Sequence, residues 1–269
     1  MTNTATSPPS SIAPADARAP YTLGIDIGGT NVKASVLDRK GELAAERVRL
    51  PTPRPATPQS LLGTIDRLVV QLPPFERISV GFPGVVKGGT VVTAPNLGTP
   101  QWAGYPLTEA LGKRFGVPVR MLNDAAVHGL GVVEGKGLEC VITLGTGIGC
   151  ALFRDRRLLL HLELGQFVRV DMTYDQYVGQ AALEAVGPEA WNERVRAAVT
   201  AVAGLTCCDL LYIGGGNARK ITFELPANVK IVSNSAGVTG GVRLWEPAME
   251  ELFAGESRAQ SRAGPERTA

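Results

Sequence analysis

The sequence predicts an α/β fold built from two related domains. Short apolar runs alternate with amphipathic helical patterns along the chain, which is typical of α/β proteins. In addition, residues 23–37 and 140–153 both read as strand, glycine turn and strand, and both turns contain Gly and Thr. A duplicated hairpin of this kind predicts two domains that face each other. The 269 residues leave room for them at roughly 100–200 residues per domain.

The expected domain limits follow from these patterns. We expect a small N-terminal domain over 20–122, a larger C-terminal domain over 123–238, and a helix over 239–255 that returns to the small domain. Residues 1–19 are rich in Ser, Thr, Pro and Ala and lack the basic and apolar regions of a secretory signal, so they are expected to be a disordered leader. The charged residues 256–269 are expected to form a disordered tail.

The elements of the N-terminal half follow in order. Strands are expected at 21–27 and 32–37, joined by a Gly-Gly turn. Apolar residues recur with helical spacing from Leu61 to Val69 and predict a helix within 57–72 that ends before Pro73. The segments RISVGFPG and PVRML then read as buried strands.

The C-terminal half begins with NDAAVHGLGVVEG, which reads as a helix with Asn123 or Asp124 as its N-cap. The second hairpin follows, and residues 188–204 form an amphipathic helix. DLLYIGGGNARKI is expected to be a strand, a triple glycine and a helix, and KIVSNSAGVTGGVRLW a final strand and helix.

The composition excludes several classes of protein. Lys and Arg number 27 and Asp and Glu 25, so the net charge of +2 does not indicate nucleic acid or an anionic membrane as a partner. No apolar run approaches the roughly 18 residues that a spanning helix needs. The four cysteines are badly spaced for disulfides or zinc and read as core residues of a reduced, cytoplasmic protein.

The two glycine turns are candidate phosphate sites. Glycine lets the backbone approach a ligand closely, and successive N–H groups can converge on phosphate oxygens. In the first turn Thr30 adds a hydroxyl, and Asp26 at the end of a strand could hold hydrated magnesium. The alternative is a plain two-residue β-turn, but the Gly/Thr chemistry recurs in the second turn, Gly145 to Gly149, and a purely structural turn has no reason to repeat it.

A third glycine segment lies between a strand and an expected helix. Backbone donors of Gly214, Gly215 and Gly216 and the neighbouring Asn217 could there meet an anion or a nucleotide. Close packing at a strand-to-helix turn is the alternative interpretation.

Several short motifs occur in a characteristic order along the chain. They are GIDIGGTNVKASVLD, GFPGVV, APNLGTPQW, LNDAAVHGLGVVEG, LGTGIGCALF, ELG and IGGGNARKI, together with TYDQYVGQAALEAVG and the following WNERV. Their order and spacing resemble those of ROK-family sugar kinases, of the actin-like, hexokinase-like and ribonuclease H-like superfamily, and are most similar to the polyphosphate glucokinases among them. The resemblance covers roughly residues 21–246.

The resemblance implies a role for each matching residue. Asp124 would be the general base, and Asp26 would hold Mg²⁺. Nucleotide or distal phosphate binding falls to Gly214, Gly215, Gly216 and Asn217. Sugar hydroxyls would be bound by Asn96, Asn123, Asp124, Glu163 and Gln166. The donor phosphates would be bound by Gly28, Gly29, Thr30, Asn31, Lys33, Thr146 and Gly147.

The chemistry of the residues allows other readings for some of these. Asn123 and Asp124 could simply cap a helix, and Asn96 could serve a loop turn. A carboxylate flanked by Leu162 and Leu164, as Glu163 is, should have a partner or a ligand. Lys33, Arg219 and Lys220 could be ordinary solvated charges.

The expected activity is transfer of a phosphoryl group to the 6-hydroxyl of glucose, with Mg²⁺ and with polyphosphate, ATP or both as donor. The resemblance further implies a homodimer, and the zinc motif CxCGxxGCxE of many family members is absent, so no structural zinc is expected. The alternatives are an ATP-dependent kinase for another hexose, or a weakly catalytic sugar-binding or regulatory relative. The family motif ExGH keeps Glu163 but has Gln166 in place of histidine, which predicts a retained but altered sugar site.

Overall fold

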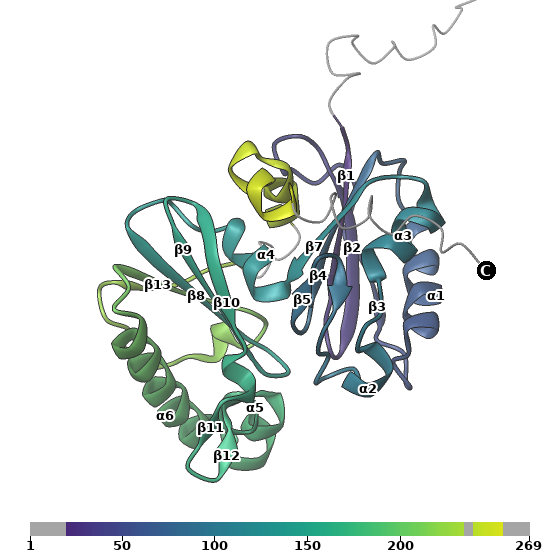
Figure 1. Ribbon diagram of the computed structural model, residues 1–269. Helices are drawn as coiled ribbons and strands as arrows, with labels where there is room; N and C mark the ends of the chain where they lie inside the picture. Colours follow the sequence, from purple (N-terminus) through teal and green to yellow (C-terminus); the bar gives the residue numbers. More distant parts are fainter. Residues whose placement is uncertain (1–19, 234–238, 255–269) are drawn as a thin grey trace, which may run out of the picture.

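The computed structural model describes residues 20–233 and 239–254, which form two lobes with a sheet in each (Figure 1). The sheet of the first lobe has five strands in the order β3-β2-β1-β4-β7. β1 pairs antiparallel with β2 and parallel with β4, and β2 pairs antiparallel with β3 and β4 parallel with β7. These strands are β1 (Thr22–Ile27), β2 (Asn31–Leu37), β3 (Val48–Pro51), β4 (Arg77–Phe82) and β7 (Val119–Asn123).

The sheet of the second lobe repeats this topology in the order β10-β9-β8-β13-β14. β8 pairs antiparallel with β9 and parallel with β13, just as β1 does with β2 and β4. The strands are β8 (Leu138–Leu144), β9 (Ile148–Arg154), β10 (Arg157–Leu162), β13 (Leu210–Gly214) and β14 (Val229–Ile231). The duplication predicted from the two hairpins is confirmed, and it extends to all five strands.

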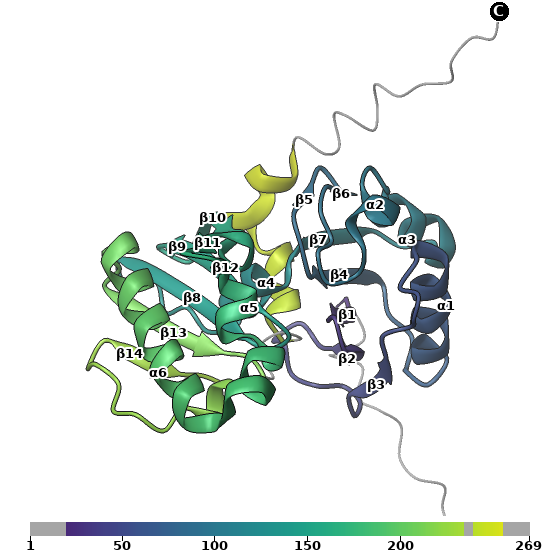
Figure 2. The same ribbon diagram turned by 90° about the horizontal axis from the view of Figure 1, so that it is seen from below.

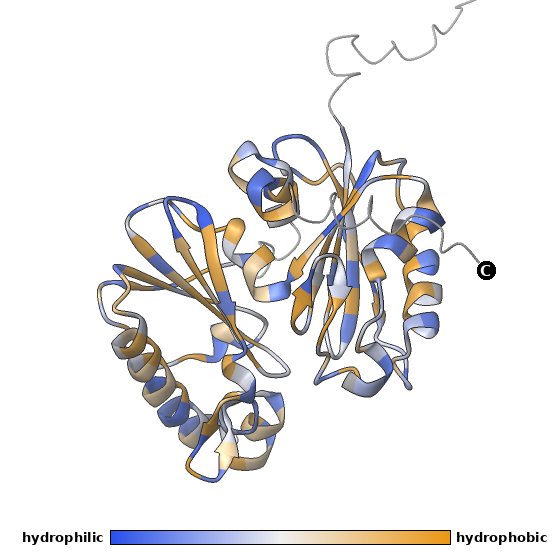
Figure 3. Cartoon of the chain, viewed as in Figure 1, coloured by the Kyte–Doolittle hydropathy of each residue, from blue (hydrophilic) through white to orange (hydrophobic). Residues whose placement is uncertain are grey.

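Each sheet is covered by helices that complete a separate core. The helix α1 (Pro58–Val69) begins at a Thr57–Ser60 capping box and packs with α3 (Leu107–Phe115) on the first sheet. The long α6 (Gln180–Thr206) covers the second sheet together with the short α5 (Tyr174–Val178). Figure 2 shows these layers from below, and Figure 3 shows apolar residues along the strands.

The short helix α4 (Asp124–Leu130) lies between the two lobes. It contacts strands of both sheets, among them β4 and β9. The 3₁₀ segment η3 (Gly240–Trp245) packs on α4 and on β1 and β4, and Ser79 Oγ donates to Gly241 O at 2.7 Å. Trp245 Nε1 in turn donates to Ser79 Oγ at 2.8 Å, so the C-terminal segment is tied to the first sheet.

The remaining elements are short. Two small hairpins, α2 and three further 3₁₀ turns complete the described part of the chain. They are β5 (Val86–Lys87), β6 (Thr90–Val91), α2 (Thr99–Trp102), η1 (Leu164–Gln166), β11 (Val168–Arg169), β12 (Met172–Thr173), η2 (Ala218–Lys220) and η4 (Pro247–Met249).

Several predicted helices differ from the structure. The helix expected after Gly214–Gly216 is only the 3₁₀ turn η2, because the chain becomes extended at Ile221 and the Thr222 N–H is held by Asn192. The helix expected over 239–255 is α-helical at 250–254 but 3₁₀ at 240–245 and 247–249, since its first residues, Gly240 and Gly241, are poor helix formers. A Cβ on Gly240 would lie 2.0 Å from Val127 O, so this position requires glycine.

Two further expectations need correction. α4 ends at Leu130, earlier than the segment to Gly135 that was predicted as helical, and the N-cap is Asn123. Cys207 is exposed instead of buried, and it is the C-cap of α6 with a left-handed φ of 48°. The helix predicted over 188–204 is confirmed and extends to Thr206, with a break at Gly187.

The expected leader 1–19 and tail 256–269 lie outside the described residues, as do 234–238 within the expected second domain. The domain limits stay predictions. Within the described part of the chain, no helix has the length and apolarity to cross a bilayer.

Candidate active site

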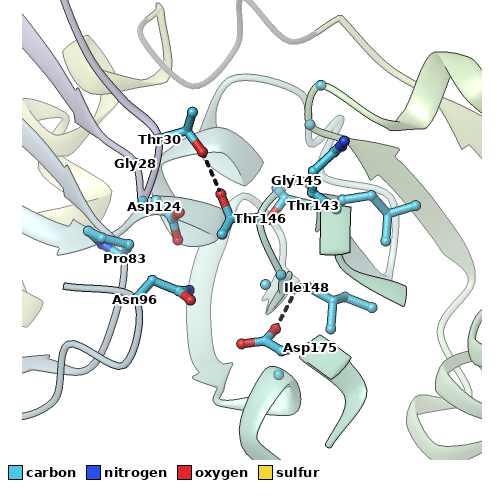
Figure 4. A pocket seen from close by; sticks show the side chains of 18 of the residues that line it. Gly28, Thr30, Pro83, Asn96, Asp124, Thr143, Gly145, Thr146, Ile148 and Asp175 are labelled. Atoms are coloured by element: carbon cyan, nitrogen blue, oxygen red, sulfur yellow. Dashed lines mark hydrogen bonds between the residues drawn. The ribbon is translucent and has the colours of Figure 1, made fainter. Parts of the chain in front are cut away.

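The two glycine turns meet across the space between the lobes. The first turn joins β1 to β2, and the second joins β8 to β9, so equivalent ends of the two sheets face each other. Thr30 Oγ1 and Thr146 Oγ1 are 3.2 Å apart, as Figure 4 shows. A Cβ on Gly29 would lie 3.2 Å from Asn96 Cβ and 3.3 Å from Thr146 Cγ2, so the turns approach closely because glycine is present.

Hydrogen bonds to carbonyl groups fix the first turn. Thr52 Oγ1 donates to Gly28 O at 2.6 Å, and Arg54 Nη2 donates to Gly29 O at 2.7 Å. These bonds occupy carbonyls, which would repel an anion. The Gly28 N–H donates to Asn31 O at 2.9 Å, so the N–H groups of Gly29 and Thr30 are the ones available to phosphate. The turn is therefore suited to an anionic ligand.

The N-terminus of α4 lies in the same space. Asn123 Oδ1 accepts the Ala125 N–H at 2.9 Å, and Asn123 Nδ2 donates to Gly84 O at 3.2 Å. Asp124 Oδ1 accepts the same Ala125 N–H at 2.8 Å, while its Oδ2 has no hydrogen-bond partner among the described residues. Capping by Asn123 thus leaves one oxygen of Asp124 free to bind a ligand.

The carboxyl group of Asp124 titrates unusually. Burial and, to a smaller extent, the nearby Asp26 carboxylate raise the pKa of Asp124 to about 7, against the opposing effect of the Ala125 hydrogen bond. A pKa near neutrality in a cleft is the property expected of a general base.

Asp26 lies beside Asp124 and forms an ion pair with Lys33. Lys33 Nζ is 2.8 Å from Asp26 Oδ2, across the β1–β2 pair, and Asp26 Oδ1 has no hydrogen-bond partner in the described residues. One carboxylate oxygen is therefore available beside the phosphate turns. This fits Mg²⁺, which proteins commonly hold through one or two carboxylates plus phosphate oxygens and water. No cluster of three metal-ligating side chains occurs in residues 20–233 and 239–254.

Glu163 and Gln166 lie on the opposite side of this space, each with a partner. His161 Nε2 is 3.3 Å from Glu163 Oε1. Gln166 Nε2 donates to Asp175 Oδ2 at 3.0 Å, so the Gln166 carbonyl oxygen is left without a partner among the described residues. Gln166 lines the cavity and therefore has an acceptor oxygen available to a ligand there.

Asp175 connects Gln166 to the second glycine turn. Its Oδ1 accepts the Ile148 N–H at 2.8 Å, as the dashed line in Figure 4 shows. A Cβ on Gly147 would lie 2.0 Å, and one on Gly165 2.3 Å, from Asp175 Oδ1. Burial raises the pKa of Asp175, the hydrogen bond from Ile148 opposes this shift, and the charge of Glu163 adds to it.

One cavity of about 610 Å³ contains nearly all the candidate residues. Its lining includes Asp26, Gly28, Gly29, Thr30, Asn31, Lys33, Asn96, Asn123, Asp124, Thr146, Gly147, Glu163, Gln166, Gly215, Gly216 and Asn217. Residues distant in sequence therefore meet in one polar cleft between the lobes.

Gly214 is the candidate residue that does not line this cavity. It is buried in β13, and a Cβ there would lie 2.1 Å from His128 Nε2. Gly214 is therefore needed for close packing, which was the alternative interpretation of this segment, whereas Gly215 and Gly216 line the cavity. His128 also lines the cavity, and burial lowers its pKa to about 4, so the ring is neutral near pH 7.

The sequence reasoning missed Arg49 and Asp175, which line this cleft, and His161, which contacts the lining residue Glu163. Arg49 is the cross-strand neighbour of Lys33, and that pairing is not visible from spacing. Asp175 stands two residues after the helix-capping Thr173, where an acidic residue looks like ordinary capping. His161 matched no motif, and its connection to the site is its contact with Glu163.

Comparison with known proteins finds a matching family model and similar sugar kinases. The ROK family model matches residues 22–161. The polyphosphate glucokinase of Mycobacterium leprae (strain TN) is 31% identical over 254 residues, which are 87% of this chain and 77% of the relative. That of Mycobacterium tuberculosis (strain ATCC 25618 / H37Rv) is 30% identical over 255 residues, covering 88% and 96%.

Solved structures share the fold. The inorganic polyphosphate/ATP-glucomannokinase from Arthrobacter sp. strain KM aligns with a TM-score of 0.76 and 31% identity, over 83% of this chain and 97% of that one. A ROK family glucokinase from Streptomyces griseus, in complex with glucose and AMPPNP, aligns with a TM-score of 0.69 at 20% identity, over 83% and 98%.

The duplicated sheets and the cleft between them define an actin-like, hexokinase-like two-domain fold of the kind found in sugar kinases. The chain belongs to the ROK family. The family predicted from the short motifs is thereby confirmed.

Proposed function

We propose that this protein phosphorylates glucose at its 6-hydroxyl, with inorganic polyphosphate, ATP or both as donor and with Mg²⁺. The observation that carries the proposal is Asp124: a carboxylate with a pKa of about 7 and one free oxygen, set beside two glycine turns that present N–H groups and threonine hydroxyls. The names of the relatives support the choice of sugar and donors.

The reaction follows from what each part can do. Phosphoryl transfer needs an in-line hydroxyl, compensation of the donor's charge and an acceptor for the hydroxyl proton. Asp124 Oδ2 orients the hydroxyl and receives its proton as transfer proceeds. The turns around Thr30 and Thr146 hold the donor phosphates.

The acceptor sugar lies between Asp124 and the loop that carries Glu163. Glu163 and Gln166 each keep an oxygen free to accept a hydrogen bond from a hydroxyl, while Asn96 and Asn123 line the cavity from the first lobe. His161 and Asp175 hold these two acceptors in place. A sugar bound in this way is fixed at several hydroxyls, which sets the reacting one against Asp124.

Mg²⁺ would be held by Asp26 Oδ1 together with donor oxygens and water. When bound, the ion compensates negative charge on the donor phosphates. Lys33, paired with Asp26, fixes that carboxylate next to the phosphate turns.

A coupled assay for glucose 6-phosphate, run with Mg²⁺ and either ATP or long-chain polyphosphate, tests the proposal. Product from at least one donor is expected. A protein that yields none with either donor would instead be a sugar-binding or regulatory relative, and product only with another hexose would point to that sugar as the substrate. The cytoplasmic location and the homodimer stay predictions.

Gln166→His tests the altered sugar site. A histidine can also donate to Asp175 Oδ2, but its ring presents a nitrogen instead of the amide carbonyl oxygen to the cavity. One hydrogen bond is worth about 0.5–1.5 kcal/mol, so we expect the KM for glucose and the preference for glucose over mannose to change roughly three- to tenfold. The measurement is initial-rate kinetics with both hexoses, and unchanged KM and preference would contradict the assignment.

A further inference from the structure

Three cations at the cleft have no side-chain partner among the described residues. Most other charges in the cavity are engaged: Lys33 pairs with Asp26, Glu163 with His161, and Asp175 with Gln166. In contrast, the side chains of Arg49, Arg219 and Lys220 line the cavity with neither an ion pair nor a hydrogen bond to any described residue.

Arg49 lies further out on the first lobe than the groups placed at the reaction centre. The strand pairing aligns Asp26 with Lys33 and Lys33 with Arg49, on β1, β2 and β3. Neighbouring strands are about 4.8 Å apart, so these three charged residues form a row that runs from Asp26 to the edge of the sheet. Lys33 is held by Asp26, and Arg49 is the first free cation on this path.

Arg219 and Lys220 belong to the other lobe. They lie in η2, directly after Gly215 and Gly216, and η2 is a single 3₁₀ turn. The free cations therefore come from both lobes, and both groups lie at the margin of the cavity that holds the two phosphate turns.

The spacing of the charges points to the chemistry of the ligand. A single phosphate group at the turns cannot also contact cations on a neighbouring sheet edge and on the opposite lobe. The charge of ATP ends with its triphosphate. In the described part of the chain no Phe, Tyr or Trp lines the cavity to stack on a base, and the His128 ring is buried. A linear polyphosphate carries negative charge along its whole length.

We propose that Arg49, Arg219 and Lys220 form an outer subsite that binds the distal phosphates of a polyphosphate donor while the glycine turns hold its reacting end. The proposal rests on the proposed function and adds to it the path of the chain. Its consequence is that affinity rises with donor length until the chain reaches these cations. Because Arg49 and Arg219 are exposed, salt weakens the effect.

Donor kinetics at saturating glucose test the subsite. Arg49→Gln, Arg219→Gln, Lys220→Gln and the triple variant are compared using long-chain polyphosphate, tripolyphosphate and ATP. Exposed charge pairs contribute roughly 0.2–1 kcal/mol each, so KM for long-chain polyphosphate should rise about two- to fivefold per variant and tenfold or more in the triple variant. KM for tripolyphosphate and kcat should stay within about twofold.

Arg154→Gln is the matched control, since Arg154 is exposed on the same lobe as Arg219 and does not line the cavity. It should behave as the wild type with every donor. Equal increases in KM for all three donors would overturn the proposal, because the cations would then serve phosphates at the turns or a nucleotide. Unchanged KM for long-chain polyphosphate in the triple variant would overturn it as well.

The two proposals fail differently. If the wild type forms no product from any donor, the proposed function fails, and direct titration with long-chain polyphosphate then decides the subsite. Binding that is weakened at least tenfold in the triple variant and unchanged in Arg154→Gln would sustain the subsite, and equal binding by all three proteins would exclude it.

Discussion

Asp124→Asn is expected to lower kcat by about 10²–10⁴-fold, the range that a positioned general base typically contributes. The substitution keeps an oxygen that can accept the Ala125 N–H, so the N-terminus of α4 retains its geometry. What is lost is the group that takes the hydroxyl proton. The measurement is kcat at saturating glucose and donor, and a kcat within about threefold of the wild type would remove Asp124 from the role of base.

The same residue sets the expected pH dependence. Its pKa is raised to about 7, chiefly by burial, so the carboxyl is protonated and inactive as a base below that pH. For the wild type, kcat/KM should therefore rise as pH increases from 6 to 8, with a midpoint near 7, and this limb should vanish in Asp124→Asn. A midpoint below about 5 would show that the carboxyl titrates as an exposed one.

A thermal-stability measurement separates catalysis from folding. The folded-state pKa of Asp124 is raised, so the folded protein holds this proton at pH values where the unfolded chain has released it. The free energy of unfolding therefore decreases as pH rises from about 4 to about 7. A neutral asparagine does not carry that cost. At pH 8 the variant should have a Tm equal to or above that of the wild type while its activity is lost, whereas a fall in Tm together with activity would indicate misfolding.

The sequence sufficed for the parts of the site that depend on local chemistry. Glycine and threonine at the ends of apolar strands predicted both turns, and the duplicated hairpin predicted two similar lobes, because local patterns determine strands and turns. Asn123 and Asp124 were also identifiable, since capping and catalysis favour the same residue types at a helix start.

The rest of the site depends on contacts between distant elements. Asp175 joins the cleft because α5 folds against the second turn, and Arg49 joins it because β3 pairs with β2. Such contacts cannot be read from spacing along one chain. The helix expected after Gly216 failed for the same reason, since Asn192 of α6 takes the Thr222 N–H that a helix would have used.

Gly147→Ala is expected to have the second large effect on activity. Gly147 does not need a left-handed backbone, so the cost comes from contact alone: the new Cβ would lie 2.0 Å from Asp175 Oδ1. Asp175 must then move, and its bonds to the Ile148 N–H and to Gln166 are lost or distorted. Because these bonds align the donor turn with the acceptor loop, and a shift of about 1 Å can cost 10²-fold, kcat/KM should fall by about that factor.

A double variant identifies the cause of this loss. If the clash with Asp175 is responsible, Gly147→Ala should add nothing once the carboxylate is removed, so Gly147→Ala/Asp175→Ala should match Asp175→Ala alone. Gly204→Ala is the matched control, since a Cβ at this site in α6 meets no atom within 4 Å, and its kcat/KM should equal the wild type. Independent, additive losses from the two substitutions would mean that Gly147 acts through its own contact with the donor, and the coupling of donor turn and acceptor loop through Asp175 would be wrong.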